Sequence, residues 1–144
     1  MRSVKGFTLI ELLIAIAIVA VLAGIAIPLY RDYVLRGMLT EATSALSSQR
    51  VRMEQFYQDA RTYLNACDPG TVATVSDTAH FSVACEIAGD GQSYVIRGTG
   101  MAGTPVDGFQ YTLDQSNNRV TTAVPSGWSL PATNCWVRKR SGEC

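Results

Sequence analysis

The sequence predicts an α+β fold in which one long N-terminal helix packs on a small antiparallel β-sheet in a disulfide-stapled head. Three observations predict it: a 24-residue apolar segment near the N-terminus, helical periodicity that continues past it, and short β-type runs in the second half. The 144 residues are enough for one modest domain. Lys+Arg and Asp+Glu are balanced at 12 each, so bulk charge does not indicate a chain that coats nucleic acid. The 8% aromatic and 17% charged residues argue against disorder.

The apolar segment occupies residues 7–30, and Glu11 is its single charged residue. As a helix it would be roughly 36 Å long, enough to cross a hydrocarbon layer about 30 Å thick. Arg2 and Lys5 precede it and would hold the N-terminus on the cytoplasmic side. A cleaved secretory signal fits poorly, because the apolar run is too long. Such a signal also needs a small-residue cleavage site after the run, whereas the small residue here, Gly6, precedes it. The segment is therefore predicted to be a single-pass membrane anchor.

A membrane anchor alone does not account for Glu11. A carboxylate inside an apolar helix costs about 2.5–3.5 kcal/mol on insertion scales, and such groups usually have a partner. Residues 7–30 contain no Lys or Arg. Cleavage after Gly6 would create a charged α-amino group on Phe7, which also needs a partner at the edge of the apolar zone. We expect neighbouring copies to satisfy both needs, which favours self-association in register.

The stretch Lys5-Gly6-Phe7-Thr8-Leu9-Ile10-Glu11 resembles the processing signature of type IV pilins and their relatives. In that family a membrane prepilin peptidase cuts after the glycine and methylates the new N-terminal residue, here Phe7. The glutamate that matches Glu11 is implicated in pairing with the N-terminal amine of a neighbouring subunit. The resemblance implies an inner-membrane single-pass precursor that later enters an extracellular pilus filament. It divides the chain into a leader 1–6, a transmembrane and filament-core helix 7–30, an amphipathic helix 31–62 and a β-rich head 63–144.

Gly24 and Pro28 mark a helix break in the apolar segment. Pro28 has no N–H to donate to the carbonyl of Gly24, and its ring crowds that carbonyl. A mild kink, common in membrane helices, would accommodate this. The pilin resemblance implies more, namely that the stretch between about Ala20 and Pro28 partly unwinds when the subunit leaves the bilayer for a filament.

Helical periodicity continues beyond the apolar segment and predicts one helix from about Thr8 to Ala60. The first half is apolar all round and must be buried in lipid or among copies of itself. The second half is amphipathic and is expected to pack on the C-terminal region. Its apolar positions are Leu35, Leu39, Ala42, Leu46, Met53, Phe56 and Ala60.

The region after Tyr63 is predicted to form a small antiparallel sheet, because Gly, Pro, Ser and Thr separate short β-type runs. Residues 115–118 (Gln-Ser-Asn-Asn) fit a hairpin turn, since Asn tolerates positive φ. The glycine-rich run between Ile96 and Phe109 is interpreted as a mobile loop. The expected strands are His80–Ile87, Ser93–Gly98, Phe109–Asp114 and Val120–Ala123.

Four cysteines, Cys67, Cys85, Cys135 and Cys144, lie beyond the membrane segment. They lack the C-x₂₋₄-C spacing that zinc favours, and an even count in an exported head suggests two disulfides. Of the three connectivities we favour Cys67–Cys85 and Cys135–Cys144, the pairs closest in sequence. A closed loop of about 15 residues contributes roughly 3 kcal/mol in the chain-entropy model.

The sequence does not indicate an enzyme, a cofactor or a resident metal. The single histidine, His80, has no acid–nucleophile arrangement near it in sequence and is expected to be structural. Gly98-x-Gly100-x-x-Gly103 has the spacing of a nucleotide-binding loop, but no helical pattern follows it, which favours a plain connection. The aspartates of the head lack the spacing of a calcium loop.

The C-terminal tail carries the one candidate ligand contact. Trp136, Arg138, Lys139 and Arg140 place three cations beside an aromatic ring inside the expected Cys135–Cys144 loop. Cations can neutralise phosphates and an exposed indole can stack on bases, so DNA contact at a filament surface is feasible. A solvated loop without a ligand is the competing interpretation.

These observations together predict a structural subunit of a type IV pilus filament that serves adhesion, twitching motility or DNA uptake. Its expected partners are copies of itself or other pilins, the prepilin peptidase, and the inner membrane before assembly. Two alternatives stay open: a minor pilin that binds DNA through the Cys135–Cys144 loop, and a pseudopilin of a type II secretion system. A measurement of DNA affinity would distinguish the DNA-binding minor pilin from the other two classes. A secretion defect without loss of surface filaments would favour the pseudopilin.

Overall fold

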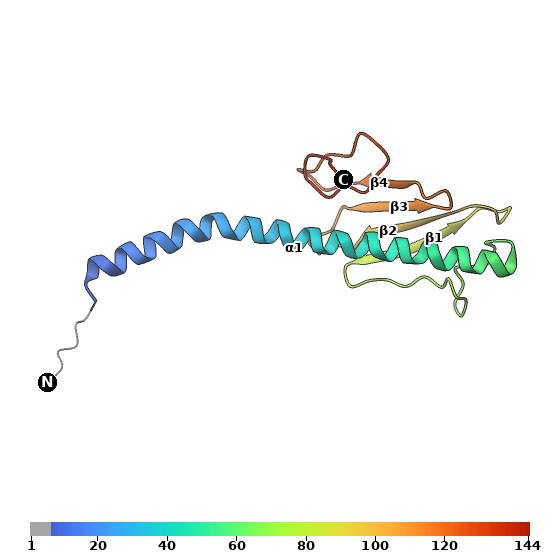
Figure 1. Cartoon of the computed structure of the whole chain (residues 1–144), viewed down its shortest axis with the longest axis horizontal. Helices are drawn as coiled ribbons and strands as arrows, with labels where there is room; N and C mark the ends of the chain where they lie inside the picture. The colour runs from blue at the N-terminus through green and yellow to red at the C-terminus, as the bar shows by residue number, and fades with distance from the viewer. Residues whose placement is uncertain (1–6) are drawn as a thin grey trace. The chain divides into compact units, whose positions relative to one another are not determined.

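The computed structural model describes residues 7–144 and contains one helix and four strands (Figure 1). The chain divides after Val34 into two units, and the second, Leu35–Cys144, contains the whole sheet. The elements are α1 (Leu9–Ala60), β1 (Phe81–Ile87), β2 (Tyr94–Gly100), β3 (Gln110–Asp114) and β4 (Arg119–Ala123). The predicted α+β fold is thereby confirmed, and each predicted element is present with its ends moved by at most two residues.

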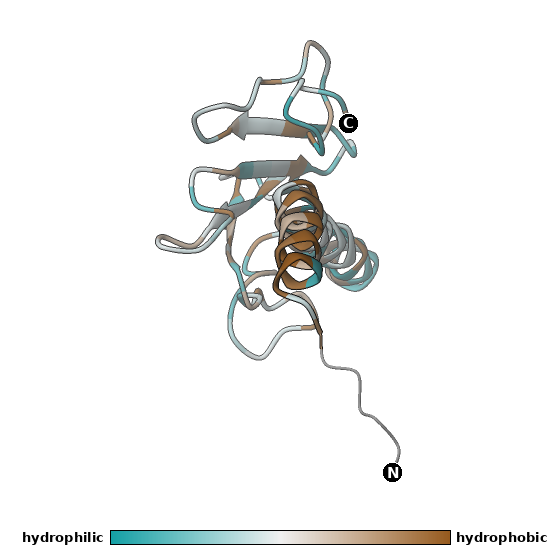
Figure 2. Ribbon diagram, turned by 90° about the vertical axis from the view of Figure 1, so that its left-hand side faces the viewer, coloured by the Kyte–Doolittle hydropathy of each residue, from teal (hydrophilic) through white to brown (hydrophobic). Residues whose placement is uncertain are grey.

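The first unit holds the apolar half of α1, which Figure 2 shows in brown. Its large apolar side chains are exposed: Phe7 is 92% and Val21 67% accessible. The helix is long and apolar enough to cross a membrane. Pro28 lies inside α1, and Gly24 is helical as well, so the weak point predicted from these two residues is accommodated without ending the helix.

Within the second unit, α1 contributes an apolar stripe to the core. Leu39, Ala42, Leu46 and Met53 recur at helical spacing and are at most 1% exposed. Leu46 lies over Gly98 of β2, where a Cβ would stand 3.6 Å from its Cδ1 atom. Full burial of one such apolar side chain stabilises a fold by about 1.5–3 kcal/mol, so this stripe is what fixes α1 to the sheet.

The sheet is an antiparallel meander with strand order β1-β2-β3-β4. Residues alternate between the core and the outer face, because successive side chains of a strand point to opposite sides. Ile96 of β2 faces Leu113 of β3 in the register, and both are buried. The turn after β3 is the predicted one: Asn117 has φ 63°, and its N–H donates to the Asp114 carbonyl at 3.0 Å.

The glycine-rich run between Ile96 and Phe109 differs from the prediction of a mobile loop. Gly98 and Gly100 are buried residues of β2, and the Gly100 N–H donates to the Phe109 carbonyl at 2.9 Å. A Cβ on Gly100 would stand 1.9 Å from the carbonyl oxygen of Val106, so only glycine fits there. Gly100 therefore serves close backbone packing, whereas Gly98 lies against the Leu46 side chain.

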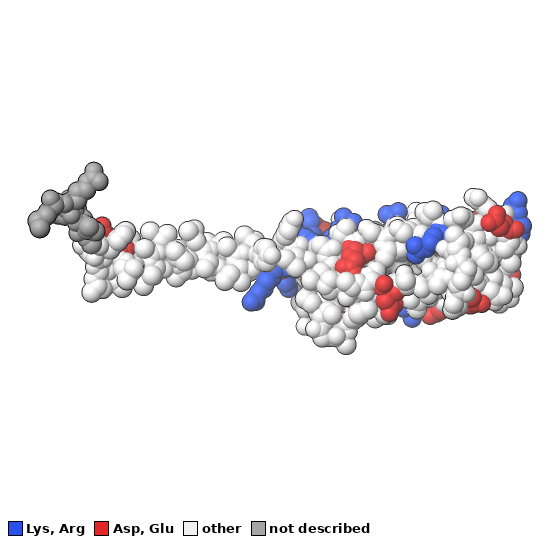
Figure 3. All heavy atoms as spheres, turned by 90° about the horizontal axis from the view of Figure 1, so that it is seen from below, with Lys and Arg blue, Asp and Glu red and all other residues white. Residues whose placement is uncertain are grey.

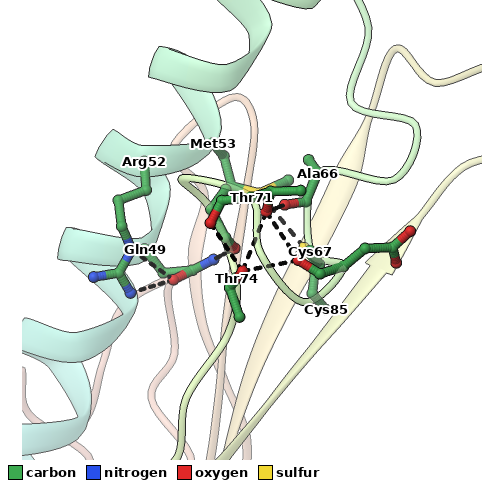
Figure 4. The surroundings of a disulfide bond; sticks show 10 residues. Gln49, Arg52, Met53, Ala66, Cys67, Thr71, Thr74 and Cys85 are labelled. Atoms are coloured by element: carbon green, nitrogen blue, oxygen red, sulfur yellow. Dashed lines mark hydrogen bonds between the residues drawn. A yellow bond between two sulfur atoms is a disulfide. The ribbon is translucent and has the colours of Figure 1, made fainter.

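Both favoured disulfides are present, Cys67–Cys85 and Cys135–Cys144. The first joins the segment after α1 to β1 (Figure 4). Gln49 of α1 supports the same segment, because its buried amide donates to the Ala73 carbonyl while its side-chain oxygen accepts from Arg52. The chain between α1 and β1 is therefore held without regular secondary structure.

Candidate functional site

The N-terminal end of α1 places Glu11 in a reciprocal cap with Thr8. The Thr8 backbone N–H and hydroxyl donate to Glu11 Oε2 at 2.8 and 2.7 Å, and the Glu11 N–H donates to Thr8 Oγ1 at 3.3 Å. This is a capping box, in which Thr8 and Glu11 satisfy each other's free groups at a helix start. Within a single subunit the carboxylate thus has neutral donors. The expected cleavage residue, Gly6, lies outside the described residues.

The surface that follows Glu11 is apolar on every side. Between Leu12 and Tyr30 the large apolar side chains are 50–68% exposed. Figure 3 shows this half of α1 as largely white, in contrast to the red and blue atoms scattered over the head. Exposed apolar area on this scale indicates a surface that contacts either lipid or other protein, because soluble monomers rarely show contiguous apolar patches above a few hundred Å².

In the tail, Trp136 is not the exposed stacking ring that the sequence suggested. It is 7% exposed and belongs to the core. Its indole N–H donates to the Thr112 carbonyl at 3.0 Å, and the neighbouring Val137 carbonyl accepts from the Tyr111 hydroxyl at 2.8 Å. Two consecutive residues, Trp136 and Val137, are buried, and the three cations that follow them are exposed. A base cannot stack on Trp136 without opening the core.

The three tail cations are separated rather than gathered into one patch. Lys139 pairs with Glu143 inside the disulfide loop. The guanidinium carbon of Arg140 lies 5.7 Å from the centroid of the Trp128 ring. Arg138 faces α1 instead, and its backbone N–H donates to the Glu143 carbonyl. The three cations therefore contact different groups and do not form one charged patch. Of the three, Arg138 lines a groove.

Arg119 is a functional candidate that the sequence analysis missed. It begins β4, where the register places it opposite Leu113, so it projects to the core side of the sheet. Its guanidinium carbon lies 5.1 Å from the centroid of the Trp136 ring, within the range of a cation–π contact. The signal was available in principle, because alternation with the inward-facing Thr121 puts Arg119 on that same face.

Two carboxylates of α1 attach the helix to the head. Glu41 Oε2 lies 2.8 Å from His80 Nδ1, and Glu41 Oε1 accepts the His80 N–H at 3.1 Å. Burial opposes ionisation of Glu41, but hydrogen bonds from Thr78 and His80 outweigh it and hold the pKa of Glu41 below its usual value. His80 thus has the structural role that the sequence predicted.

Glu54 accepts hydrogen bonds from two tyrosine hydroxyls. Tyr94 donates to Glu54 Oε1 at 3.1 Å, and Tyr63 lies 3.2 and 3.3 Å from the two carboxylate oxygens. Burial, together with the negative charge of Glu54, raises the pKa of Tyr63 to about 12 and raises that of Tyr94 further. Both hydroxyls therefore stay protonated as donors at neutral pH.

Comparison with known proteins agrees with the architecture. Residues 1–27 match the prokaryotic N-terminal methylation motif, and residues 28–108 match the model described as type IV minor pilin ComP, DNA uptake sequence receptor. The chain is 34% identical to fimbrial protein EcpC of Eikenella corrodens, over 90% of this chain and 93% of that protein. It is 30% identical to a fimbrial protein of Pseudomonas aeruginosa, over 94% and 98% of the two chains.

A solved type IV pilin from Shewanella oneidensis has a similar fold. It superposes with a TM-score of 0.50 over 72% of this chain and 98% of its own, at 17% identity. The chain belongs to the type IV pilin family. This is a family of structural proteins and not of enzymes. The methylation motif with its apolar helix fits an inner-membrane precursor and an extracellular pilus.

Proposed function

We propose that the chain is a subunit of a type IV pilus filament and that burial of residues 7–30 drives its assembly. The observation that supports this most is the exposed apolar surface of the first unit. Once a subunit has left the bilayer, each Leu, Ile or Val of this segment that is buried against neighbours, and not exposed to water, contributes about 1.5–3 kcal/mol, so this segment can hold the subunit in the polymer. The fimbrial names of its relatives support the same conclusion.

Register along the filament depends on Glu11. Cleavage after Gly6 frees an amine on Phe7, one residue before Thr8, whose hydroxyl and N–H hold the Glu11 carboxylate. A charged amine from a neighbouring subunit is a stronger partner than the neutral Thr8 donors, because it adds a Coulomb attraction to the carboxylate that a neutral N–H or hydroxyl does not provide. Subunit addition would replace the cap within one chain by an ion pair between two.

DNA contact by the head is the second candidate function. The observation that favours it is the match of residues 28–108 to the minor-pilin model whose description names a DNA uptake sequence receptor. Arg138, Lys139 and Arg140 add exposed cations on the tail, within the Cys135–Cys144 loop. Changing all three to Ala should weaken salt-sensitive DNA binding, and unchanged binding would remove the tail from this role.

A deletion strain separates filament assembly from secretion. If the chain is a pilus subunit, its loss should reduce surface filaments, twitching motility or transformation, while exported enzymes still reach the medium. A secretion defect with normal filaments would instead identify a pseudopilin. The deletion strain is complemented with the wild-type gene and, in parallel, with a Glu11→Gln gene. If only the wild-type gene restores the lost phenotype, the defect depends on the carboxylate of residue 11.

A further inference from the structure

An open groove lies between α1 and the C-terminal part of the head. Its volume is about 370 Å³. One wall is made of α1 hydroxyls and the other of β4 and the tail. The lining residues are Thr40, Thr43, Ser44, Ser47, Ser48, Arg119, Trp136 and Arg138. Two guanidinium groups and no carboxylate line it, so the groove suits an anion.

The Arg119 guanidinium is held in position before any ligand arrives. It stacks on the Trp136 ring, which is fixed by burial and by its bond to the Thr112 carbonyl. Among residues 7–144, no acidic side chain forms an ion pair with Arg119 or Arg138. The stacked face leaves the N–H edges of the guanidinium for a ligand, and such a fork matches the geometry of a phosphate.

The opposite wall supplies neutral donors. Ser44 and Ser48 are exposed and lie one helical turn apart, so their hydroxyls share one face of α1. Ser47 differs, because its hydroxyl donates to the Thr43 carbonyl at 2.7 Å. The nearest helix carboxylate, Glu41, is engaged by His80 instead of lining the groove.

We propose that this groove binds a backbone phosphate of DNA, with Arg119 and Arg138 on one side and the Ser44 and Ser48 hydroxyls on the other. The inference rests on the proposed DNA contact and specifies where the strand lies: beside α1, with the Trp136 ring serving as the platform of Arg119. Recognition here is of phosphate and carries no base information.

The test is titration of labelled duplex DNA with the processed full-length chain in detergent micelles, across salt concentrations. Arg119→Gln should lower affinity about tenfold and reduce the slope of log affinity against log salt by about 1, since one phosphate contact is lost. Arg119→Lys should keep that slope. Ser44→Ala with Ser48→Ala should lower affinity with the slope unchanged, and these exposed sites tolerate Ala in a helix.

Arg61→Gln is the matched control, because it removes the same charge at an exposed position beyond the far end of α1. If Arg119→Gln and Arg61→Gln weaken DNA binding equally, the groove is not the site, although the chain still binds DNA. If the wild-type chain shows no salt-dependent DNA binding, the proposed DNA contact is wrong and the groove assignment fails with it. Inorganic phosphate is titrated in parallel; binding that Arg119→Gln abolishes while DNA affinity is unchanged would assign the groove to free phosphate and overturn the proposal.

Discussion

Replacing Glu54 by Ala tests how the head is fixed to α1. The carboxylate accepts from Tyr63 and Tyr94, whose side chains are 5% and 1% exposed. Removing it leaves two hydroxyls without their acceptor, and each unsatisfied buried group costs about 1–3 kcal/mol. We therefore expect Glu54→Ala to lower the free energy of unfolding by roughly 2–6 kcal/mol, a large share of a small domain's stability.

The assay is urea unfolding of the full chain in detergent, followed by near-UV circular dichroism, which reports the packing of the buried aromatic rings of the head. Glu86→Ala is the control, because Glu86 pairs with Arg97 on the exposed outer face with 63% of its side chain accessible, where a pair contributes at most about 1 kcal/mol. Absorbance titration gives a second measurement: the pKa of Tyr63, about 12 in the wild type, should fall toward its ordinary value in the Glu54 variant. Equal losses in the Glu54 and Glu86 variants would refute this reasoning.

Three further predictions concern the head and the stem. The pKa of Glu41 is lowered in the folded chain, so the contribution of its carboxylate to stability is complete above the unfolded value of 4.5 and is lost as pH falls through the lower folded value. Acid unfolding of Glu41→Gln should therefore depend less on pH than that of the wild type. An unchanged pH dependence would count against the contact between Glu41 and His80. Changing Cys135 and Cys144 together to Ser should lower stability by about 2–3 kcal/mol, measured by thermal unfolding. The control is Ser126→Ala at an exposed position. A loss no larger than that of the control would mean that other contacts hold the tail. Pro28→Ala should restore a backbone hydrogen bond to Gly24 and make the stem harder to unwind, so filaments should become less extensible under force; identical extensibility would exclude a role for this break.

Local patterns predicted the elements of the fold. Helical spacing located the centre of the α1 stripe, since Leu39 to Met53 are buried as predicted, but it extended the stripe too far, because Ala60 is exposed. Punctuation by turn residues located all four strands, because that signal repeats along the head. The cysteine pairs nearest in sequence are also the bonded ones. Composition alone predicted residues 7–30 to be a membrane anchor, and it was Glu11 together with the pilin resemblance that suggested a role in assembly.

Contacts between distant segments could not be predicted in this way. The tail sequence shows an aromatic ring beside cations, and only the fold reveals that Trp136 is buried beneath Arg119 of β4. The pairing of Glu54 with Tyr94 spans 40 residues and likewise leaves no local pattern. Gly100 resembled part of a flexible run because sequence does not show the Val106 carbonyl packed against it. Glu11 is hydrogen-bonded to Thr8 in a capping box. The spacing of these two residues in the sequence could have predicted this contact, but the interpretation of the segment as a membrane anchor did not consider it.

The N-terminal residue of the chain in assembled filaments tests the central claim most directly. Filaments sheared from cells are examined by mass spectrometry, with a Glu11→Gln strain prepared alongside. A subunit that polymerises through its freed amine must begin at N-methylated Phe7, and the Glu11→Gln strain should yield few filaments. Filaments built from chains that still carry residues 1–6 would contradict the account.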